Sequence, residues 1–396
     1  MSTTTRVGLQ VQDDPALLDL MLEDLHEGPE LYQPGNYWAN YEKLLVPELR
    51  TTGLRDFRRR RASIVNTFGA ADFDPITAEL NTHPANPESS GRLRVKRLIL
   101  ELARRVRPAS RALRALGASY VGASLEGVQQ LCYVYAAAYG RSNGARPLED
   151  FSASTAGNPE DVFVVDGRTY TTSMLQSYIL YAYCCRFLSF DTIQSVMELG
   201  SGSGKQVEVI RKLHPQLSYF LFDIPPQLYV CEQYLRAVFP DSVVSYRETR
   251  TFRGLGRPQP GKIYMFGTAK LAELDDLRWD LFWNAASFQE MEPDLVLNYL
   301  GFVNRQTGRH VFLEENMHGM HQASHPGEHG VLQRTTMEHY RRGLPDFDLV
   351  DLREAIDLQR LRTSSKSLYS FSFWNRTESP DEGGSAGTRR GTSFAQ

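Results

Sequence analysis

The pattern of apolar and polar residues between positions 196 and 239 predicts a strand, a helix and a second strand. Residues 196–199 form a short, mostly apolar run that is typical of a buried parallel strand. Residues 206–213 carry apolar side chains at helical spacing, so we expect a helix packed on a sheet. Residues 217–222 are the next apolar run, and Asp223 follows it. This order predicts an α/β fold with a Rossmann-like sheet.

Similar patterns predict further elements toward the C-terminus. Short apolar runs indicate strands at 243–246, 262–266, 280–285, 347–352 and 366–374. A helix is expected at 335–342. We expect the last two strands to give the sheet an antiparallel end.

The first half of the chain has mainly helical patterns. Helices are expected from residue 15, at 37–49, 92–116 and 125–139, and from 171–173 onward. A chain of 396 residues exceeds what one hydrophobic core usually serves. We therefore predict an N-terminal helical-bundle domain at 1–190, for substrate capping or dimerisation, an α/β domain at 191–378 and a disordered tail at 379–396.

Composition narrows the possible partners and location. Apolar residues make up 41% of the chain and charged residues 23%, and the net charge is −3. Nothing here favours nucleic acid or an anionic membrane as a partner. The four cysteines form no C-x-x-C pair, and no signal or spanning segment is evident, so a cytoplasmic protein is predicted. The basic run at 58–61 is interpreted as a solvated helix face or an ion-pair site.

Three alternating glycines, Gly200, Gly202 and Gly204, follow the first strand. The spacing matches neither a phosphate loop nor the G-x-G-x-x-G of dinucleotide enzymes. Glu198 stands two residues before the turn, and Asp223 lies 23 residues after Gly200, where an acid commonly holds ribose hydroxyls. This pattern is typical of S-adenosylmethionine (SAM) enzymes, whereas an ordinary glycine-rich turn without a ligand is the alternative.

The segments ELGSGSGKQ, FDIPPQLYVCEQYL and SFQEM resemble the family of SAM-dependent sugar O-methyltransferases. The resemblance runs from Tyr37-Trp38 to about Trp374, and FDIPP is similar to the FDLP segment of plant-type O-methyltransferases. The chain also resembles the arginine guanidine N-methyltransferase of streptozotocin biosynthesis. The resemblance implies a class I SAM methyltransferase fold with SAM as cofactor. The candidate cofactor-binding residues are Glu198, Gly200, Ser201, Gly202, Gly204, Asp223, Ile224, Phe266, Gly267 and Asn284.

The loop at 286–293 is expected to face the transferred methyl group. Plant-type enzymes carry a general-base histidine in the equivalent loop, whereas this chain has Gln289, Glu290 and Glu292 there. Carboxylates that grip a guanidinium localise one nitrogen lone pair, so these residues are candidate catalytic groups. A helix N-cap is the alternative reading. The candidate acceptor contacts are Ser287, Phe288, Met291, Glu314 (or Glu315), His318, Tyr170 and Tyr178.

Two of these candidates have competing interpretations. Tyr170 and Tyr178 belong to an aromatic stripe at helical spacing, which also fits plain core packing. His318, His321, His325 and His329 are closely spaced, but glycine and proline between them argue against one helix face, so no metal is predicted. His318 remains a candidate general base for a sugar hydroxyl.

The sequence thus predicts a SAM-dependent methyltransferase for a small polar metabolite of natural-product biosynthesis. N-methylation of the arginine guanidino group is favoured because the loop is acidic and lacks histidine. O-methylation of a sugar-like hydroxyl is the alternative, and a non-catalytic SAM-fold partner of another enzyme is a third reading. A homodimer is expected, while the acceptor, its regiochemistry and the number of methyl groups stay open.

Overall fold

The computed structural model describes residues 10–59, 125–256, 258–358 and 367–377. The helix predicted at 92–116 and the tail at 379–396 lie outside these ranges, as do Arg60 and Arg61. The described helices and strands agree with most of the elements that the sequence predicts.

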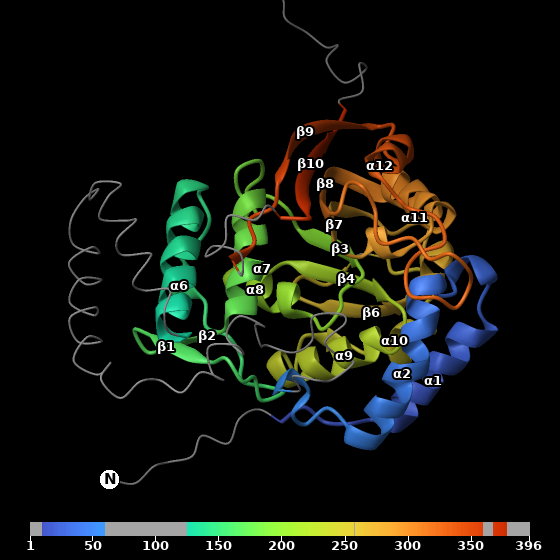
Figure 1. Ribbon diagram of the computed structural model, residues 1–396, viewed down its shortest axis with the longest axis horizontal. Helices are drawn as coiled ribbons and strands as arrows, with labels where there is room; N and C mark the ends of the chain where they lie inside the picture. The colour runs from blue at the N-terminus through green and yellow to red at the C-terminus, as the bar shows by residue number, and fades with distance from the viewer. Residues whose placement is uncertain (1–9, 60–124, 257, 359–366, 378–396) are drawn as a thin grey trace, which may run out of the picture.

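The central element is a twisted sheet of eight strands (Figure 1), in the order β5-β6-β4-β3-β7-β8-β10-β9. The strands are β3 (Ser195–Leu199), β4 (Ser218–Asp223), β5 (Val243–Val244), β6 (Ile263–Gly267), β7 (Trp279–Ala285), β8 (Thr307–Glu315), β9 (Phe347–Glu354) and β10 (Ser370–Arg376). The strands from β5 to β8 are parallel, and β10 runs antiparallel to both of its neighbours. The predicted α/β fold with a Rossmann-like sheet and an antiparallel end is confirmed.

The predicted strand at 243–246 is shorter than expected because a helix begins inside it. Ser245 and Glu248 form a capping box, in which each side chain bonds the backbone of the other. This S-x-x-E pattern starts α10 (Tyr246–Thr249) and leaves β5 only two residues.

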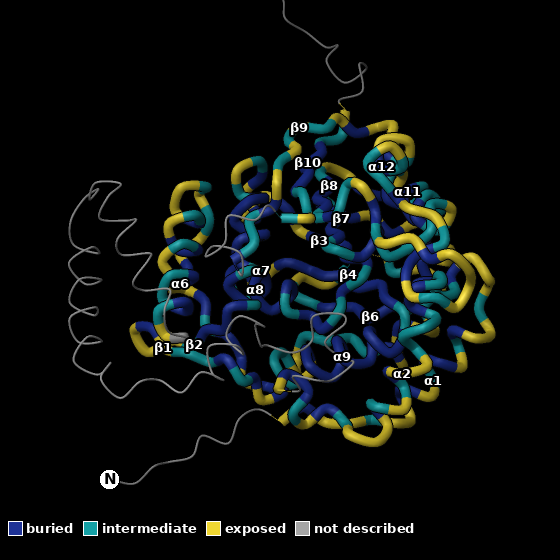
Figure 2. The backbone as a smooth tube through the Cα atoms, viewed as in Figure 1, coloured by how far each residue is buried: buried dark blue, intermediate teal, exposed yellow. Residues whose placement is uncertain are grey.

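Helices cover both faces of the sheet. One face carries α7 (Thr172–Cys184), α8 (Lys205–Leu213) and α9 (Gln227–Val238), whose buried side chains pack with Val196, Tyr219 and Leu281. The other face carries α11 (Pro293–Gln306) and α12 (Met337–Gly343), which pack with the side chains that point the opposite way. Figure 2 shows the sheet as the buried centre of the molecule, with the exposed positions on the outer helices and loops.

The described N-terminal helices lie against this sheet unit at two different places. They are α1 (Pro15–Glu27), α2 (Asn36–Thr52) and α6 (Leu125–Ser142). Helix α1 contacts α9 and α6 contacts α7, and Figure 1 shows α6 at the left of the molecule and α1 and α2 at its lower right. Their buried residues join the same hydrophobic cluster as one face of the sheet. The helical N-terminal region is therefore present, while its division from the α/β part at residue 190 stays a prediction.

A hairpin that the sequence analysis did not predict precedes α7. It joins β1 (Phe163–Val165) to β2 (Arg168–Tyr170) through Asp166 and Gly167, which both have positive φ angles. Asp-Gly directly after the apolar run at 162–165 is a hairpin signal that was available in the sequence. Short 3-10 turns complete the fold: η1 (Glu30–Tyr32), η2 (Phe57–Arg59), η4 (Leu148–Asp150), η5 (Thr268–Glu273) and η6 (Phe288–Glu290). Among the described helices, none has the length and apolarity needed to cross a membrane.

Arg58 shows that one member of the basic run is a core residue and not part of a solvated face. Its side chain is fully buried, and it donates to the carbonyls of Ser154 and Ala156 and to the Tyr234 hydroxyl. Tyr234 in turn donates to the buried carboxylate of Glu208 on α8. This network ties the N-terminal region to the helix that follows the glycine turn.

We expect Arg58→Met to lower the free energy of unfolding by about 3 kcal/mol, because it breaks a buried network that includes a charged group. Chemical denaturation measures the change. The matched control is Arg59→Met, because Arg59 is exposed and lies 3.8 Å from Glu160, a separation at which an ion pair contributes little. Equal losses in the two variants would contradict a structural role for the Arg58 network.

Candidate active site

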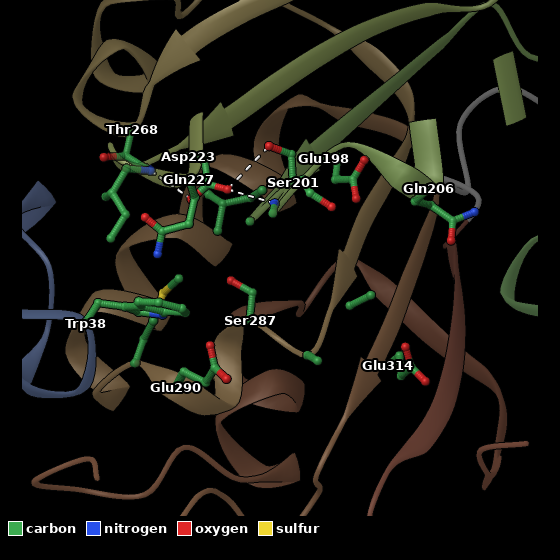
Figure 3. Close-up of a pocket in the computed structure, with 18 of the residues that line it drawn as sticks. Trp38, Glu198, Ser201, Gln206, Asp223, Gln227, Thr268, Ser287, Glu290 and Glu314 are labelled. Atoms are coloured by element: carbon green, nitrogen blue, oxygen red, sulfur yellow. Dashed lines mark hydrogen bonds between the residues drawn. The ribbon is translucent and has the colours of Figure 1, made fainter. Parts of the chain in front are cut away.

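A cavity of about 580 Å³ lies at the carboxyl ends of β3, β4, β7 and β8 (Figure 3). Its walls come from the glycine turn, the loop after β7, the end of β8 and Tyr369, with further residues from α2 and α7. Ligands of open parallel sheets bind at this edge, outside the carboxyl ends of the strands. The cavity is therefore the candidate active site.

The glycine turn brings bare backbone to the cavity. Gly200 has a φ of +78°, and a Cβ there would collide with the Ser287 side chain. Gly204 has a φ of +80° and packs against Leu235 and Cys231 of α9, so it is a structural glycine of the turn and does not line the cavity. The turn thus needs glycine both for its left-handed backbone and for close packing.

Asp223 lies at the end of β4 and lines the cavity. Its carboxylate accepts hydrogen bonds from Ile224 N (2.8 Å), Gly202 N (3.0 Å) and Ser201 Oγ (3.3 Å), and dashed lines in Figure 3 mark hydrogen bonds of this carboxylate. Burial raises the pKa of Asp223 to about 7 although these donors act in the opposite direction. The donors fix the carboxylate beside the cavity, where it has remaining capacity to accept from ligand hydroxyls.

Glu198 is a buried carboxylate that the described residues leave partly unsatisfied. Its side chain is 4% exposed, and Oε2 has no hydrogen-bond partner among the described residues. Burial, and then the nearby Asp223, raise its pKa well above the usual value. A cationic ligand group at this wall would satisfy the carboxylate, and SAM carries both an ammonium and a sulfonium. The residues present therefore fit SAM.

Three of the predicted cofactor contacts lie behind the cavity wall. Phe266 is buried and stacks on Phe222 with the ring centroids 4.9 Å apart, and Gly267 pairs with Asp223 in the sheet. Asn284 is fully buried, donates to Leu199 O (2.7 Å) and accepts from Phe288 N (3.1 Å). Asn284 is thus a brace between the glycine turn and the loop after β7.

Some residues of the acidic loop at 286–293 line the cavity, and others support the loop from behind. Ser287, Glu290 and Met291 line the cavity, whereas Phe288 belongs to the hydrophobic core. Gln289 is buried, accepts from Asn316 N (2.6 Å) and donates to the Tyr369 hydroxyl (3.3 Å). Both ends of its amide therefore bind neighbouring protein groups, and its catalytic role stays a prediction.

The structure does not bring Glu292 into the cavity beside Glu290. Glu292 is the N-cap residue of α11 and does not line the cavity. Its Oε1 accepts from Leu332 N (3.0 Å), and its Oε2 lies so close to Gly35 that a Cβ there would collide with it. Glu292 thus connects the loop at 327–332 with the start of α2.

The end of β8 supplies the second acidic side chain to the cavity. Because side chains alternate along a strand, Glu314 lines the cavity while Glu315 points away. Glu315 accepts from Phe288 N (3.3 Å) and Gln289 N (3.0 Å) and so holds the acidic loop. Burial raises the pKa of Glu314 and of Glu315 to about 8. Burial, followed by the Glu315 charge, also raises the pKa of Glu290 well above its ordinary value.

The histidines lie away from the cavity. His318 is exposed and lines a separate surface hollow together with His321. His329 packs against the rings of Tyr37 and Tyr41. Within the described ranges no histidine lines the cavity, and no group of three potential metal ligands occurs. The predicted acceptor contact at His318 is therefore not supported by its position.

Helix α7 covers the cavity with a different face from the one predicted. Tyr170 and Tyr178 are buried and donate to the carbonyls of Leu148 and Arg146, which supports the packing interpretation. The cavity is lined by the neighbouring stripe of α7, namely Ser173, Gln176, Ser177 and Leu180. Trp38, Gln227, Thr268 and Tyr369 also line the cavity, and the sequence analysis did not identify them.

Comparison with known proteins supports one part of this site directly. A family profile described as an O-methyltransferase domain matches residues 120–254, about a third of the chain. The matched segment includes Glu198, the glycine turn and Asp223, so it supports SAM as the cofactor, as the sequence predicts. No curated protein matches the chain significantly.

Several solved structures are similar over about half of the chain. The pyocyanin biosynthetic protein PhzM is 15% identical over 52% of this chain and 57% of that chain, with a TM-score of 0.35. The mitomycin 7-O-methyltransferase MmcR is 9% identical over 52% and 57%, with a TM-score of 0.34. Magnesium protoporphyrin IX methyltransferase from Synechocystis PCC 6803, with bound SAH, is 10% identical over 52% and 85%, with a TM-score of 0.35. The alignments span little more than half of PhzM and MmcR, and overlaps this small carry no argument about function.

We expect Asp223→Ala to weaken binding of S-adenosylhomocysteine by about 100-fold, because charge-assisted hydrogen bonds to two ribose hydroxyls would be lost. Isothermal titration calorimetry measures the dissociation constant. Asp241→Ala, at an exposed turn after α9, is the control and should bind like the unaltered protein. Unchanged affinity in Asp223→Ala would show that this carboxylate does not hold the cofactor.

Proposed function

We propose that this protein is a SAM-dependent methyltransferase that methylates the guanidino group of arginine. The observation that carries the proposal is the pair of acidic side chains in the cavity beyond the cofactor residues. Glu290 and Glu314 both line it, no described histidine does, and Figure 3 draws the two carboxylates on either side of the space below Ser287. A planar cation with several N–H donors suits two separated carboxylates.

The chain's own residues would divide the work between binding and alignment. Bound SAM supplies an electrophilic methyl group on its sulfonium. Asp223 and Glu198 hold the ribose and the ammonium group, and so set the direction of the methyl group. Glu290 and Glu314 accept hydrogen bonds from guanidino nitrogens, which localises the lone pair of the remaining nitrogen. Ser287 lies between the cofactor residues Asp223 and Glu198 and the acceptor pair Glu290 and Glu314.

The raised pKa values also give the carboxylates a role in proton transfer. A guanidinium nitrogen that gains a methyl group must lose a proton, and a carboxylate of ordinary pKa is a weak acceptor for it. Burial makes Glu314 and Glu290 more basic than exposed glutamates. The same side chains therefore attract the cation and accept its proton.

O-methylation of a sugar-like hydroxyl is the second candidate, and the match to an O-methyltransferase profile favours it. A hydroxyl acceptor needs a base at the moment of attack, and Glu290 or Glu314 would serve because of their raised pKa values. The two candidates differ in what the cavity binds. A guanidine acceptor requires both carboxylates, whereas a hydroxyl acceptor requires one. The homodimer and the cytoplasmic location remain predictions.

Glu290→Gln is expected to reduce kcat/KM for methylation of arginine by about 100-fold or more, because a buried carboxylate would no longer pair with the cation. Mass spectrometry of the product gives the rate. Glu292→Gln is the matched control, since it changes a glutamate of the same loop that lies outside the cavity and keeps an oxygen that accepts from Leu332 N.

Activity on arginine that survives in Glu290→Gln, or none in the unaltered protein, would defeat the arginine proposal. Methylation of a sugar panel by the unaltered protein would promote the second candidate. A chain that binds neither SAM nor S-adenosylhomocysteine would point to the non-catalytic partner.

Arginine binding should strengthen as the pH rises. Burial holds the pKa of Glu314 at about 8, so near pH 7 its carboxyl is mostly protonated and must release a proton to pair with a guanidinium. The dissociation constant is therefore expected to fall between about pH 6 and 8, by up to tenfold per pH unit for each proton released, and to level off above. Calorimetry in buffers of different ionisation enthalpy counts the protons. Glu314→Gln should flatten this dependence, and a pH-independent affinity of the unaltered protein would contradict it.

A further inference from the structure

One wall of the acceptor side comes from the N-terminal helix α2. Trp38 lies on this helix, is 7% exposed and lines the cavity. Figure 3 places its indole between Gln227 and Glu290. The Trp38 indole and Glu290 line the same part of the cavity, and the interaction of the indole with Glu290 acts to lower the pKa of Glu290 against the larger effects of burial and Glu315.

A set of hydrogen bonds holds the start of α2 in this position. The Asn36 amide donates to the carbonyls of Glu328 (2.9 Å) and Gly330 (2.8 Å) and accepts from Gly327 N (2.8 Å). Asn40 also donates to Glu328 O (3.1 Å). These contacts attach the first turns of α2 to the loop at 327–332, which contains His329.

Aromatic and acidic side chains strengthen the same attachment. Tyr41 hydrogen-bonds His329 across 3.2 Å, and the Tyr37 ring lies 5.3 Å from the His329 ring. Glu292 binds the loop at Leu332 N and contacts the start of α2 at Gly35. The loop at 327–332 and Glu292 therefore both hold α2 beside the cavity.

We propose that Trp38 is a specificity-determining residue of the acceptor site, whose indole N–H fixes the Glu290 carboxylate and whose ring forms the wall beside a planar cationic acceptor. Aromatic faces attract guanidinium groups, and a rigid donor leaves the Glu290 oxygens in one orientation. A fixed carboxylate and a flat wall select a planar guanidinium over a compact ammonium. This inference rests on the proposed function and deepens it.

The test measures arginine binding to Trp38→Phe and to the unaltered protein, both saturated with S-adenosylhomocysteine. We expect the dissociation constant of arginine to rise about tenfold, as for a lost hydrogen bond to a charged group, and the preference for arginine over lysine to shrink. The affinity for S-adenosylhomocysteine should stay within about twofold. The pH midpoint of arginine binding should move upward, because Glu290 loses a donor to its ionised form.

The other titratable groups that interact with Glu290 stay in place in this variant: Glu315, Asp223, Tyr37 and Tyr369. Trp374→Phe is the matched control, because it removes another buried indole N–H. That N–H donates to Ser372 Oγ (3.0 Å), and Trp374 does not line the cavity. Arginine should quench tryptophan fluorescence in the unaltered protein and in this control, and should not do so in Trp38→Phe. Asn36→Ala, which leaves Trp38 itself unchanged, should also weaken arginine binding selectively.

The outcomes separate this inference from the proposed function. If the unaltered protein binds no arginine, both are overturned. If it binds arginine and Trp38→Phe binds it equally well, with the same pH midpoint and the same preference over lysine, this inference alone is overturned. Equal weakening of arginine and S-adenosylhomocysteine would show a general structural role for Trp38 and would also overturn it. If Trp38→Phe does not fold, unchanged arginine affinity in Asn36→Ala has the same consequence.

Discussion

The structure depends on the burial of carboxylates at the carboxyl edge of a parallel sheet. Glu198, Asp223, Glu290 and Glu314 all line one cavity, and burial is the largest cause of the raised pKa of each. A buried carboxylate without a counter-charge is costly, so the protein alone holds these groups in an unfavourable state. Cationic ligands relieve this cost. SAM would bring an ammonium and a sulfonium toward Glu198, and a guanidinium acceptor would do the same for Glu290 and Glu314.

Supporting residues keep the cavity in shape without lining it. Glu315 and Asn284 bind the backbone of the acidic loop, and Gln289 links that loop to Asn316 and Tyr369. Residues of the same chemical type thus have different tasks according to which side of a strand or loop they occupy. The two glutamates at the end of β8 are the clearest case, because one faces the cavity and the other holds the loop.

Much of the fold was predictable from sequence because it follows from local patterns. Apolar runs located the strands, the three glycines and Asp223 located the cofactor end, and the antiparallel end was expected. The acceptor end was harder, since it depends on contacts between distant segments. Trp38 reaches the cavity only because α2 is fixed to the loop at 327–332, and no local pattern encodes that attachment. Glu292 could not be separated from Glu290 without the geometry of the loop, whereas the hairpin at Asp166-Gly167 had a signal that was overlooked.

The most direct test of this account is an experimental structure of the protein with S-adenosylhomocysteine and arginine. The account predicts the ribose on Asp223, the amino group of the cofactor product on Glu198, and the guanidino group between Glu290 and Glu314 with one nitrogen facing the sulfur. A guanidino group bound elsewhere, or a cavity that holds a phosphate-bearing nucleotide, would contradict it.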